Sequence, residues 1–225
     1  MKPVIAIDGP AASGKGTLSR KLAQVLGYAH MDTGALYRAV GLEVLTAGGD
    51  PSLEKDALIG CAALSRKLES GKGQEALASL ELRREDVGDA ASQVAGIQAV
   101  RDALVDIQRR FAKCPPGTVQ GAVLDGRDIG TVICPEAPLK LFVTADLEIR
   151  AKRRLKELQS KGLPVTYDAV LADMRARDAR DSGRKAAPLR PAEDAVVIDS
   201  SHLNEAQMLE KALECVKDAF GSDPV

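Results

Sequence analysis

The sequence predicts an α/β fold in which helices cover a parallel β-sheet. Short apolar runs typical of buried strands recur along the chain, and each is followed by small or polar residues and then by helical spacing. This alternation is typical of βα units, whose parallel strands are buried on both faces. The length of 225 residues is enough for one large α/β domain or two small ones.

The composition is that of an ordinary globular protein, with 45% hydrophobic and 28% charged residues. The 31 Lys and Arg residues nearly cancel the 32 Asp and Glu residues, so the chain lacks the basic field of a nucleic-acid binder. No apolar run approaches the roughly 18–20 residues that a membrane span needs. The apolar run near the start is too short for a signal peptide. We therefore expect a cytoplasmic protein.

The four cysteines favour a reducing compartment. They are widely separated and form no CxxC pair, so we expect reduced thiols rather than disulfides or metal ligands. These cysteines are Cys61, Cys114, Cys134 and Cys215.

Five segments have the apolar character of strands. They are residues 3–7, 28–31 (the weakest), 122–124, 139–143 and 195–198. Helices are predicted from apolar spacing and from Gly and Pro stop signals. Their ranges are 17–26, 34–47, 92–111, 146–160, a helix capped by Asp168 and running to about 181, and 204–219. Residues 50–90 show no clear pattern.

The first strand leads directly into a glycine-rich loop, Gly9-Pro10-Ala11-Ala12-Ser13-Gly14-Lys15-Gly16-Thr17. A GxxxxGK loop between a strand and a helix binds phosphates, because backbone N–H groups and the positive end of the helix converge on them. Lys15 adds a charge that can reach the β- and γ-phosphates. We therefore predict a nucleotide triphosphate site in this loop, often called a P-loop.

Several classes of P-loop protein are disfavoured. A GTPase needs an NKxD guanine reader, yet Asn204 is the only asparagine in the chain. The LSGGQ-like signature of a transport ATPase is also missing. A kinase acting on a small metabolite remains.

Two further arginines follow predicted strands. Arg38 lies in Met31-Asp32-Thr33-Gly34-Ala35-Leu36-Tyr37-Arg38, and Arg127 lies in Asp125-Gly126-Arg127-Asp128-Ile129-Gly130-Thr131. The carboxyl ends of parallel strands meet in one crevice, so both can converge on a second phosphate group. The alternatives are an exposed helix residue for Arg38 and a structural salt bridge for Arg127.

The combination of IDGPAASGKGT, MDTGALYR, LDGRDIGTVICPEAP and RARDARDSGR resembles the bacterial cytidylate kinase family. The resemblance covers nearly the whole chain except its middle. It implies a three-layer P-loop kinase fold with a central five-stranded parallel sheet. It also implies an acceptor-binding region over about 33–111 and a helical lid over about 150–185, within one kinase domain over 1–225. Residues 53–90 depart from the family because its small β-rich insert looks shortened and helical here.

The resemblance also implies a binding site for CMP. Thr33, Arg101 and Asp128 would hydrogen-bond the cytosine, whose amine and acceptors suit a carboxylate and a guanidinium. Arg38 and Arg127 would bind the phosphate of CMP. For Arg101, which falls inside an apolar stripe, the alternative is a buried salt bridge. Tyr37 would support the pocket or be a core tyrosine.

The segment 150–190 is basic, with twelve Lys or Arg residues against five acids, a charge of +7. By family analogy Arg177 and Asp181 bind the ribose, while Arg180 and Arg184 reach phosphates. Arg150 would stack on adenine and Arg154 would touch phosphates. A solvated face with intrahelical ion pairs is the alternative.

The implied reaction is transfer of the γ-phosphoryl group of ATP to CMP or dCMP, with Mg²⁺ as the cofactor. Lys15, Arg127 and Arg180 would offset the charge on the transferring group. Thr17 and Asp125 would hold the metal, partly through water. We expect a monomer, and we interpret His30 and His202 as structural. The alternatives are a P-loop kinase for UMP or another metabolite, a regulatory nucleotide-binding module and, least favoured, a nucleic-acid binder.

Overall fold

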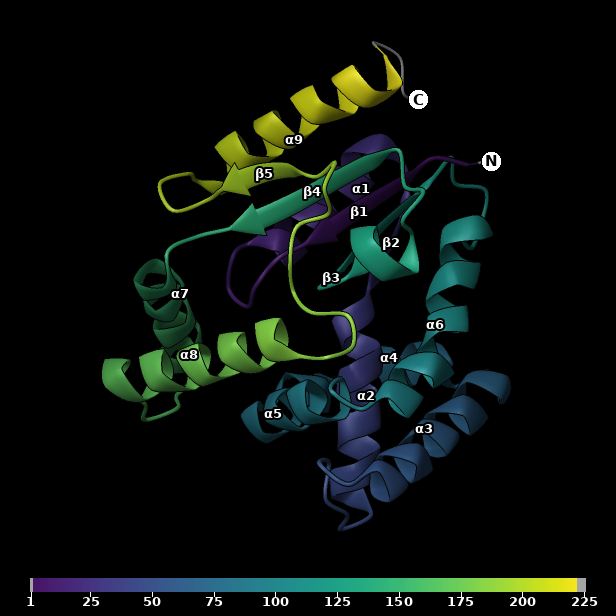
Figure 1. The fold of residues 1–225 in the computed structure, drawn as a ribbon, viewed down its shortest axis with the longest axis vertical. Helices are drawn as coiled ribbons and strands as arrows, with labels where there is room; N and C mark the ends of the chain where they lie inside the picture. Colours follow the sequence, from purple (N-terminus) through teal and green to yellow (C-terminus); the bar gives the residue numbers. More distant parts are fainter. Residues whose placement is uncertain (1, 222–225) are drawn as a thin grey trace. The chain divides into compact units, whose positions relative to one another are not determined.

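The protein is built around a parallel sheet with the strand order β2-β3-β1-β4-β5 (Figure 1). It is seen in a computed structural model that describes residues 2–221. The strands are β1 (Val4–Asp8), β2 (Ala29–Asp32), β3 (Ala122–Gly126), β4 (Leu139–Thr144) and β5 (Val196–Asp199). All five predicted strands are therefore confirmed, including the weakest. The central strand β1 pairs with β3 on one side and β4 on the other.

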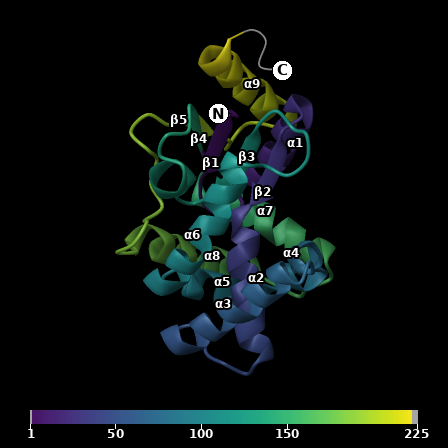
Figure 2. The ribbon, with the colours of Figure 1, turned by 90° about the vertical axis from the view of Figure 1, so that its right-hand side faces the viewer.

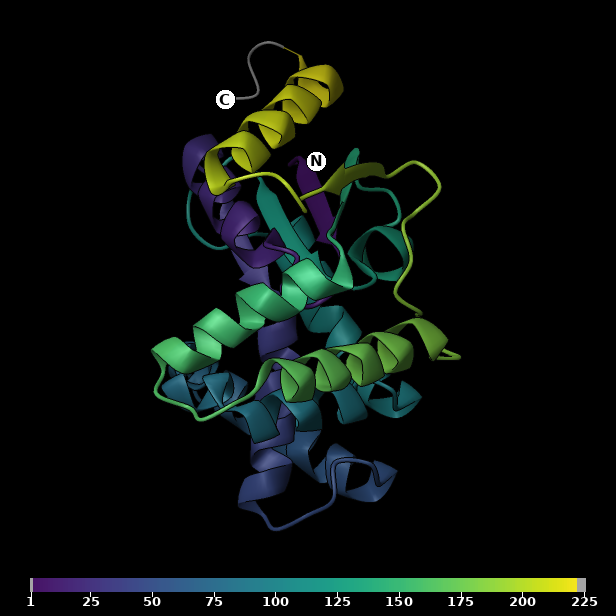
Figure 3. The ribbon, with the colours of Figure 1, turned by 90° about the vertical axis from the view of Figure 1, so that its left-hand side faces the viewer.

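The two faces of β1 have different partners because successive side chains point in opposite directions. Ile5 and Ile7 are fully buried in one cluster with Leu22 of α1 (Lys15–Leu26) and Met208 of α9 (Glu205–Phe220). Asp8 alternates with them and contacts η2 (Ile129–Ile133), a short π-helical turn. Figure 3 shows α1 and α9 on one side of the strands and the 129–133 turn on the other.

The two helices of the basic segment, α7 (Leu147–Ser160) and α8 (Tyr167–Gly183), lie side by side (Figure 3). Their contact has an apolar part formed by Ala151, Leu158, Val170 and Met174. The prediction that Asp168 caps α8 is wrong. Thr166 is the N-cap, and its hydroxyl accepts a hydrogen bond from the N–H of Ala169. Asp168 lies in the first turn instead, where a carboxylate also suits the helix dipole.

The chain divides into two compact units, one formed by residues up to Met31 together with Arg110 onward, the other by Asp32–Arg109. The second unit is helical. It contains α2 (Thr33–Thr46), α3 (Glu54–Glu69), α4 (Gly73–Ala78), a 3-10 turn η1 (Leu80–Arg83), α5 (Glu85–Val94) and most of α6 (Gln98–Lys113). Helices α3 and α5 pack against α2 (Figure 2). The helical character expected for residues 53–90 is thus confirmed.

The single helix predicted over 92–111 is wrong. The chain leaves α5 at Val94 and re-enters a helix only at Gln98. Gly96 and Ile97 form short turn bonds back to Gln93 and Val94. The apolar spacing on both sides of this turn is compatible with one continuous stripe, which is why spacing alone did not reveal the interruption.

All four cysteines lie in the described range and are free thiols. None of the described helices combines the length and the apolar character that crossing a membrane requires.

The contact between α2 and α5 depends on Gly41. A Cβ atom added there would lie 2.9 Å from Cβ of Ala90 and 3.1 Å from the backbone nitrogen of Ala91. We expect Gly41→Ala to lower the free energy of unfolding by about 1–3 kcal/mol, although alanine is intrinsically the better helix former. Urea denaturation measures this change. Gly183→Ala in α8, where a Cβ would meet nothing within 4 Å, is the control and should not destabilise; an equal loss in both variants would contradict the packing explanation.

Candidate functional site

The phosphate loop has the backbone shape that anion binding requires. Gly9 has φ +154, and a Cβ atom there would lie 2.0 Å from the carbonyl oxygen of Val143, so only glycine fits. Gly14, the N-cap of α1, has φ +90. Ala12 also adopts a left-handed conformation, with φ 58, which a non-glycine residue takes only when its surroundings impose it. The two glycines thus suit the shape of the loop, whereas Ala12 is held in a conformation that its residue type does not favour.

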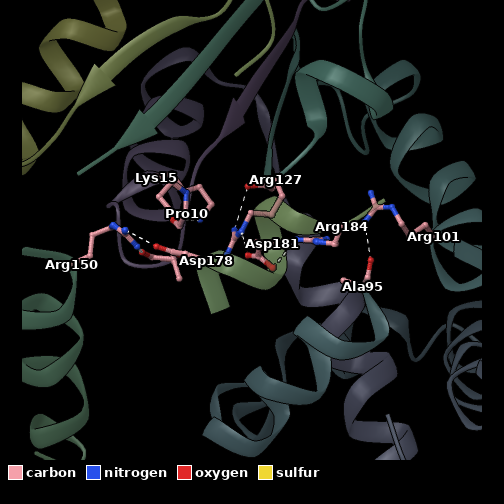
Figure 4. A network of polar contacts seen from close by, with 11 residues as sticks. Pro10, Lys15, Ala95, Arg101, Arg127, Arg150, Asp178, Asp181 and Arg184 are labelled. Atoms are coloured by element: carbon pink, nitrogen blue, oxygen red, sulfur yellow. Dashed lines mark hydrogen bonds and ion pairs between the residues drawn. The ribbon is translucent and has the colours of Figure 1, made fainter. Parts of the chain in front are cut away.

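Lys15 and Ser13 face the interior of this loop. Lys15 Nζ donates to the carbonyl oxygen of Pro10 at 3.0 Å (Figure 4), and the residue is buried. The Ser13 side chain is 0% exposed. Its hydroxyl has no hydrogen-bond partner within the described part of the chain. A buried hydroxyl of this kind costs free energy unless a ligand satisfies it, so Ser13 and Lys15 together fit a phosphate group.

Residues after β5 and on α7 clamp the loop from outside. The Ser200 hydroxyl donates to the carbonyl oxygen of Ser13 at 2.8 Å, and Arg153 donates to the Ser200 hydroxyl at 3.0 Å. Arg150 donates to the carbonyl oxygens of Ala145 at 2.8 Å and, more weakly, of Ala11 at 3.4 Å. Two carbonyl oxygens of the loop, those of Ala11 and Ser13, are thus hydrogen-bonded from outside it.

A buried carboxylate connects β1 to the segment that carries Arg127 and Asp128. Asp8 is 4% exposed. Its two oxygens accept the backbone N–H groups of Ile129 and Gly130, each at 2.8 Å. Asp128, the N-cap of η2, is also buried. The two ends of neighbouring strands are thus fixed to each other by one side chain.

Arg127 belongs to a buried cluster of charges with Asp181 and Arg184 (Figure 4). Asp181 Oδ2 accepts from Arg127 Nε at 2.9 Å, and Oδ1 accepts from Arg184 Nη2 at 2.7 Å. Burial alone would raise the pKa of Asp181, but the two guanidinium groups outweigh it and hold that pKa below its ordinary value. Asp181 therefore stays ionised and keeps two cations in place.

The other arginines of the basic segment differ in their surroundings. Arg150 is buried and pairs with Asp178 at 2.7 Å, as Figure 4 shows. Arg154 pairs with Glu157 at 2.9 Å. Arg177 lies near Asp181 and lowers its pKa, while Arg180 is exposed on α8. The salt bridges foreseen as alternatives for Arg127 and for this segment are present, and the ligand roles of these residues stay predictions.

The start of α1 offers hard oxygen ligands that suit Mg²⁺. Asp125, at the end of β3, is 3% exposed. Its Oδ1 atom would lie 4.0 Å from a Cβ atom built on Gly16, the residue before Thr17. The carboxylate of Asp125 thus lies near the start of α1, and its oxygens, with the hydroxyl of Thr17 one residue further on, are of the ligand type that suits the ion.

The second unit holds four residues predicted to bind CMP. Thr33 is buried at the start of α2. Arg38, one turn further on, pairs with Asp32 at 2.5 Å. Its guanidinium covers Gly34, where a Cβ atom would lie 3.2 Å from Nη1. Arg38 is thus partly buried and paired rather than a plain exposed helix residue.

Tyr37 and Arg101 lie together in the same unit. The guanidinium carbon of Arg101 is 5.7 Å from the ring centroid of Tyr37, within cation–π range. Arg101 is only 6% exposed. Its Nη1 atom donates to the carbonyl oxygen of Ala95 at 3.2 Å (Figure 4). Ala95 lies in the turn between α5 and α6, so the interruption of the helix supplies an acceptor for a buried cation.

Sequence reasoning missed Asp8, Ser200 and the ion-pair partner Asp178. Asp8 could have been found from the sequence, because it ends an apolar strand and an acid buried there must have hydrogen-bond or charged partners. Ser200 had a weaker signal, because it follows the strand β5 and therefore lies at the carboxyl edge of the sheet. Nothing in the sequence indicated the role of Asp178, because a carboxylate on a charged helix is ordinarily solvated.

Asp8 should make stability depend on pH in a particular direction. Burial raises its pKa from 3.8 to about 7, in spite of the two N–H donors that favour the charged form. The folded chain keeps this proton to higher pH than the unfolded chain, so the stabilising contribution is complete below pH about 4 and is lost as pH rises towards 7. Asp8→Asn removes this titration. Between pH 4 and pH 7 the free energy of unfolding of the wild type should therefore fall, relative to that of the variant, by on the order of a few kcal/mol.

Urea denaturation of both proteins between pH 4 and pH 8 measures that difference. Asp173→Asn, at an exposed carboxylate of α8, is the matched control and should follow the wild type at every pH. Parallel curves for Asp8→Asn and the wild type would show that Asp8 titrates normally.

Comparison with known proteins assigns a family to this site. The cytidylate kinase family model matches residues 5–218. The cytidylate kinase of Paramagnetospirillum magneticum is 55% identical over 213 residues, covering 95% of this chain and 97% of that protein. The cytidylate kinase of Rhodospirillum rubrum is 54% identical over 211 residues, covering 94% and 95%.

A solved structure supports the fold alone. An uncharacterized protein from Eubacterium ventriosum matches with a TM-score of 0.50 at 14% identity, covering 99% of this chain and 100% of that one. The parallel sheet with its flanking helices, the phosphate loop and the family match confirm the three-layer P-loop kinase fold. The chain belongs to the cytidylate kinase family.

Proposed function

We propose that this protein transfers the γ-phosphoryl group of ATP to CMP and dCMP. A phosphate oxygen of CMP forms a bond to the γ-phosphorus, the bond to the bridging oxygen of ADP breaks, and the products are CDP and ADP. The observation that carries the proposal is a GxxxxGK phosphate loop, in which Gly16 separates Thr17 from the buried Lys15. The chain that contains this loop matches the cytidylate kinase family from residue 5 to residue 218.

The reaction needs positioning and charge neutralisation rather than a general base. The acceptor phosphate has a second pKa near 6 and is mostly a dianion at pH 7. Lys15, Arg127 and Arg180 would offset the charge that spreads over the transferring group. When bound, Mg²⁺ would neutralise phosphate charge, and Asp125 and Thr17 would hold it. The phosphate of CMP would bind to Arg38 and Arg127 and would release them from the carboxylates that hold them now.

The acceptor base would be read by Thr33, Arg101 and Asp128. Arg101 supports this assignment because its guanidinium is already held in a fixed place by Tyr37 and Ala95. A preorganised cation loses less conformational entropy when it binds the acceptor atoms of cytosine.

The basic helices α7 and α8 would form the lid over 150–185. Residues 33–111 would form the acceptor-binding region. The lid would exclude water, the competing acceptor. The protein would bind the small molecules ATP, CMP and dCMP. It would act in the cytoplasm, where these nucleotides occur, and it would do so as a monomer.

A substrate panel with a base-reading variant tests this function. With ATP and Mg²⁺, we expect the wild type to phosphorylate CMP and dCMP much faster than UMP, AMP or GMP, as measured by coupled release of ADP. Asp128→Ala removes a charged hydrogen-bonding group, so it should raise the KM for CMP by roughly 10–100-fold and leave the KM for ATP within about twofold.

Asp173→Ala, at an exposed carboxylate of α8, serves as the control and should behave as the wild type. Equal rates with UMP and CMP, or equal effects of Asp128→Ala on both KM values, would contradict the assignment. Circular dichroism of each variant separates lost binding from lost folding.

A further inference from the structure

His30 is a partly buried contact of the Asp125 carboxylate, and the phosphate loop motif does not include it. The Nε2 atom of His30 lies 2.7 Å from Oδ2 of Asp125. Because a carboxylate can only accept, the imidazole N–H donates in this bond. The His30 side chain is 19% exposed and that of Asp125 5% exposed, so the bond is largely shielded from water and from salt.

The sheet fixes the position of this imidazole. The backbone N–H of Ala29, the preceding residue, donates to the carbonyl oxygen of Gly121 at 2.9 Å, which ties the start of β2 to the start of β3. The N–H of Tyr28 donates to the carbonyl oxygen of Ala23 at 2.9 Å, which ties the same segment to the end of α1. His30 therefore reaches Asp125 from an anchored strand rather than from a loop.

The two oxygens of Asp125 face different elements. Oδ2 is held by His30 on β2, whereas Oδ1 is near the first turn of α1, 4.0 Å from a Cβ atom built on Gly16. A carboxylate on a short side chain can rotate about its last bond, and a hydrogen bond to one oxygen fixes that rotation. The imidazole thus helps to set which way Oδ1 points.

We propose that His30 is a positioning residue for phosphoryl transfer, which holds the Asp125 carboxylate with Oδ1 directed at the start of α1. This inference rests on the proposed function, in which Asp125 and Thr17 hold the magnesium ion. Side chains that orient metal ligands in this way commonly change metal affinity or activity by 10–100-fold when they are removed.

The test compares His30→Ala, His30→Asn and, as the matched control, His202→Ala at an exposed histidine. Rates are measured against free Mg²⁺ at saturating ATP and CMP. Binding of Mn²⁺ in the presence of ADP is followed by electron paramagnetic resonance, which needs no turnover. Thermal unfolding of each variant reports on stability.

We expect His30→Ala to lower kcat about tenfold and to raise the half-saturating concentrations of Mg²⁺ and Mn²⁺ severalfold, with the KM for CMP within about twofold. His30→Asn, whose amide N–H can still donate, should recover most of both losses. His202→Ala should match the wild type. In an Asp125→Asn background, His30→Ala should add less than about a twofold effect, because the two residues act as one unit.

Two results would overturn the inference. One is a His30→Ala variant that loses only thermal stability while its Mg²⁺ and Mn²⁺ saturation is unchanged. The other is an undiminished effect of His30→Ala in the Asp125→Asn background. A wild type that binds Mn²⁺ with ADP but does not phosphorylate CMP would refute the proposed function instead, and the Mn²⁺ measurements would still decide the role of His30.

Discussion

The site must keep several cations close together before any phosphate arrives. Guanidinium groups repel one another, and burying them without partners costs several kcal/mol each. The protein meets this constraint with carboxylates that pair with the guanidinium groups. Asp181 holds both Arg127 and Arg184, and Asp178 holds Arg150. These ion pairs hold the three guanidinium groups in fixed positions. The ion pairs of Arg127, Arg150 and Arg184 are therefore compatible with a role of the same residues in ligand binding.

In the second unit, too, arginine side chains are held by neighbouring protein groups. Arg38 is held by Asp32, and Arg101 by the ring of Tyr37 and the carbonyl oxygen of Ala95. That carbonyl belongs to the turn that separates α5 from α6. The interruption between α5 and α6 thus makes the Ala95 carbonyl available to Arg101. A continuous helix would have used that carbonyl in its own backbone hydrogen bonds. A buried arginine in an apolar stripe is a reason to look for such an interruption.

The sheet and the phosphate loop were predictable because each depends on local sequence. Buried parallel strands need continuous apolar runs, and a GxxxxGK loop binds phosphate through its own backbone. The remaining features depend on contacts between distant parts of the chain. The bonds from Asp8 to Ile129 and Gly130, from Ser200 to Ser13 and between Arg150 and Asp178 join residues far apart in sequence. The helix cap at Thr166 was missed for a different reason, because Asp168 is an equally good capping residue type two positions away.

We propose that the phosphate of CMP replaces carboxylates as the partner of Arg38 and Arg127, which pair here with Asp32 and Asp181. A crystal structure with a bisubstrate analogue, adenosine and cytidine joined by a chain of phosphates, tests it most directly. We expect Arg38 and Arg127 both to contact the phosphate on the cytidine side, with Lys15 on the same polyphosphate chain. An analogue bound while Arg127 remains on Asp181 and Arg38 on Asp32, with neither touching a phosphate, would contradict it.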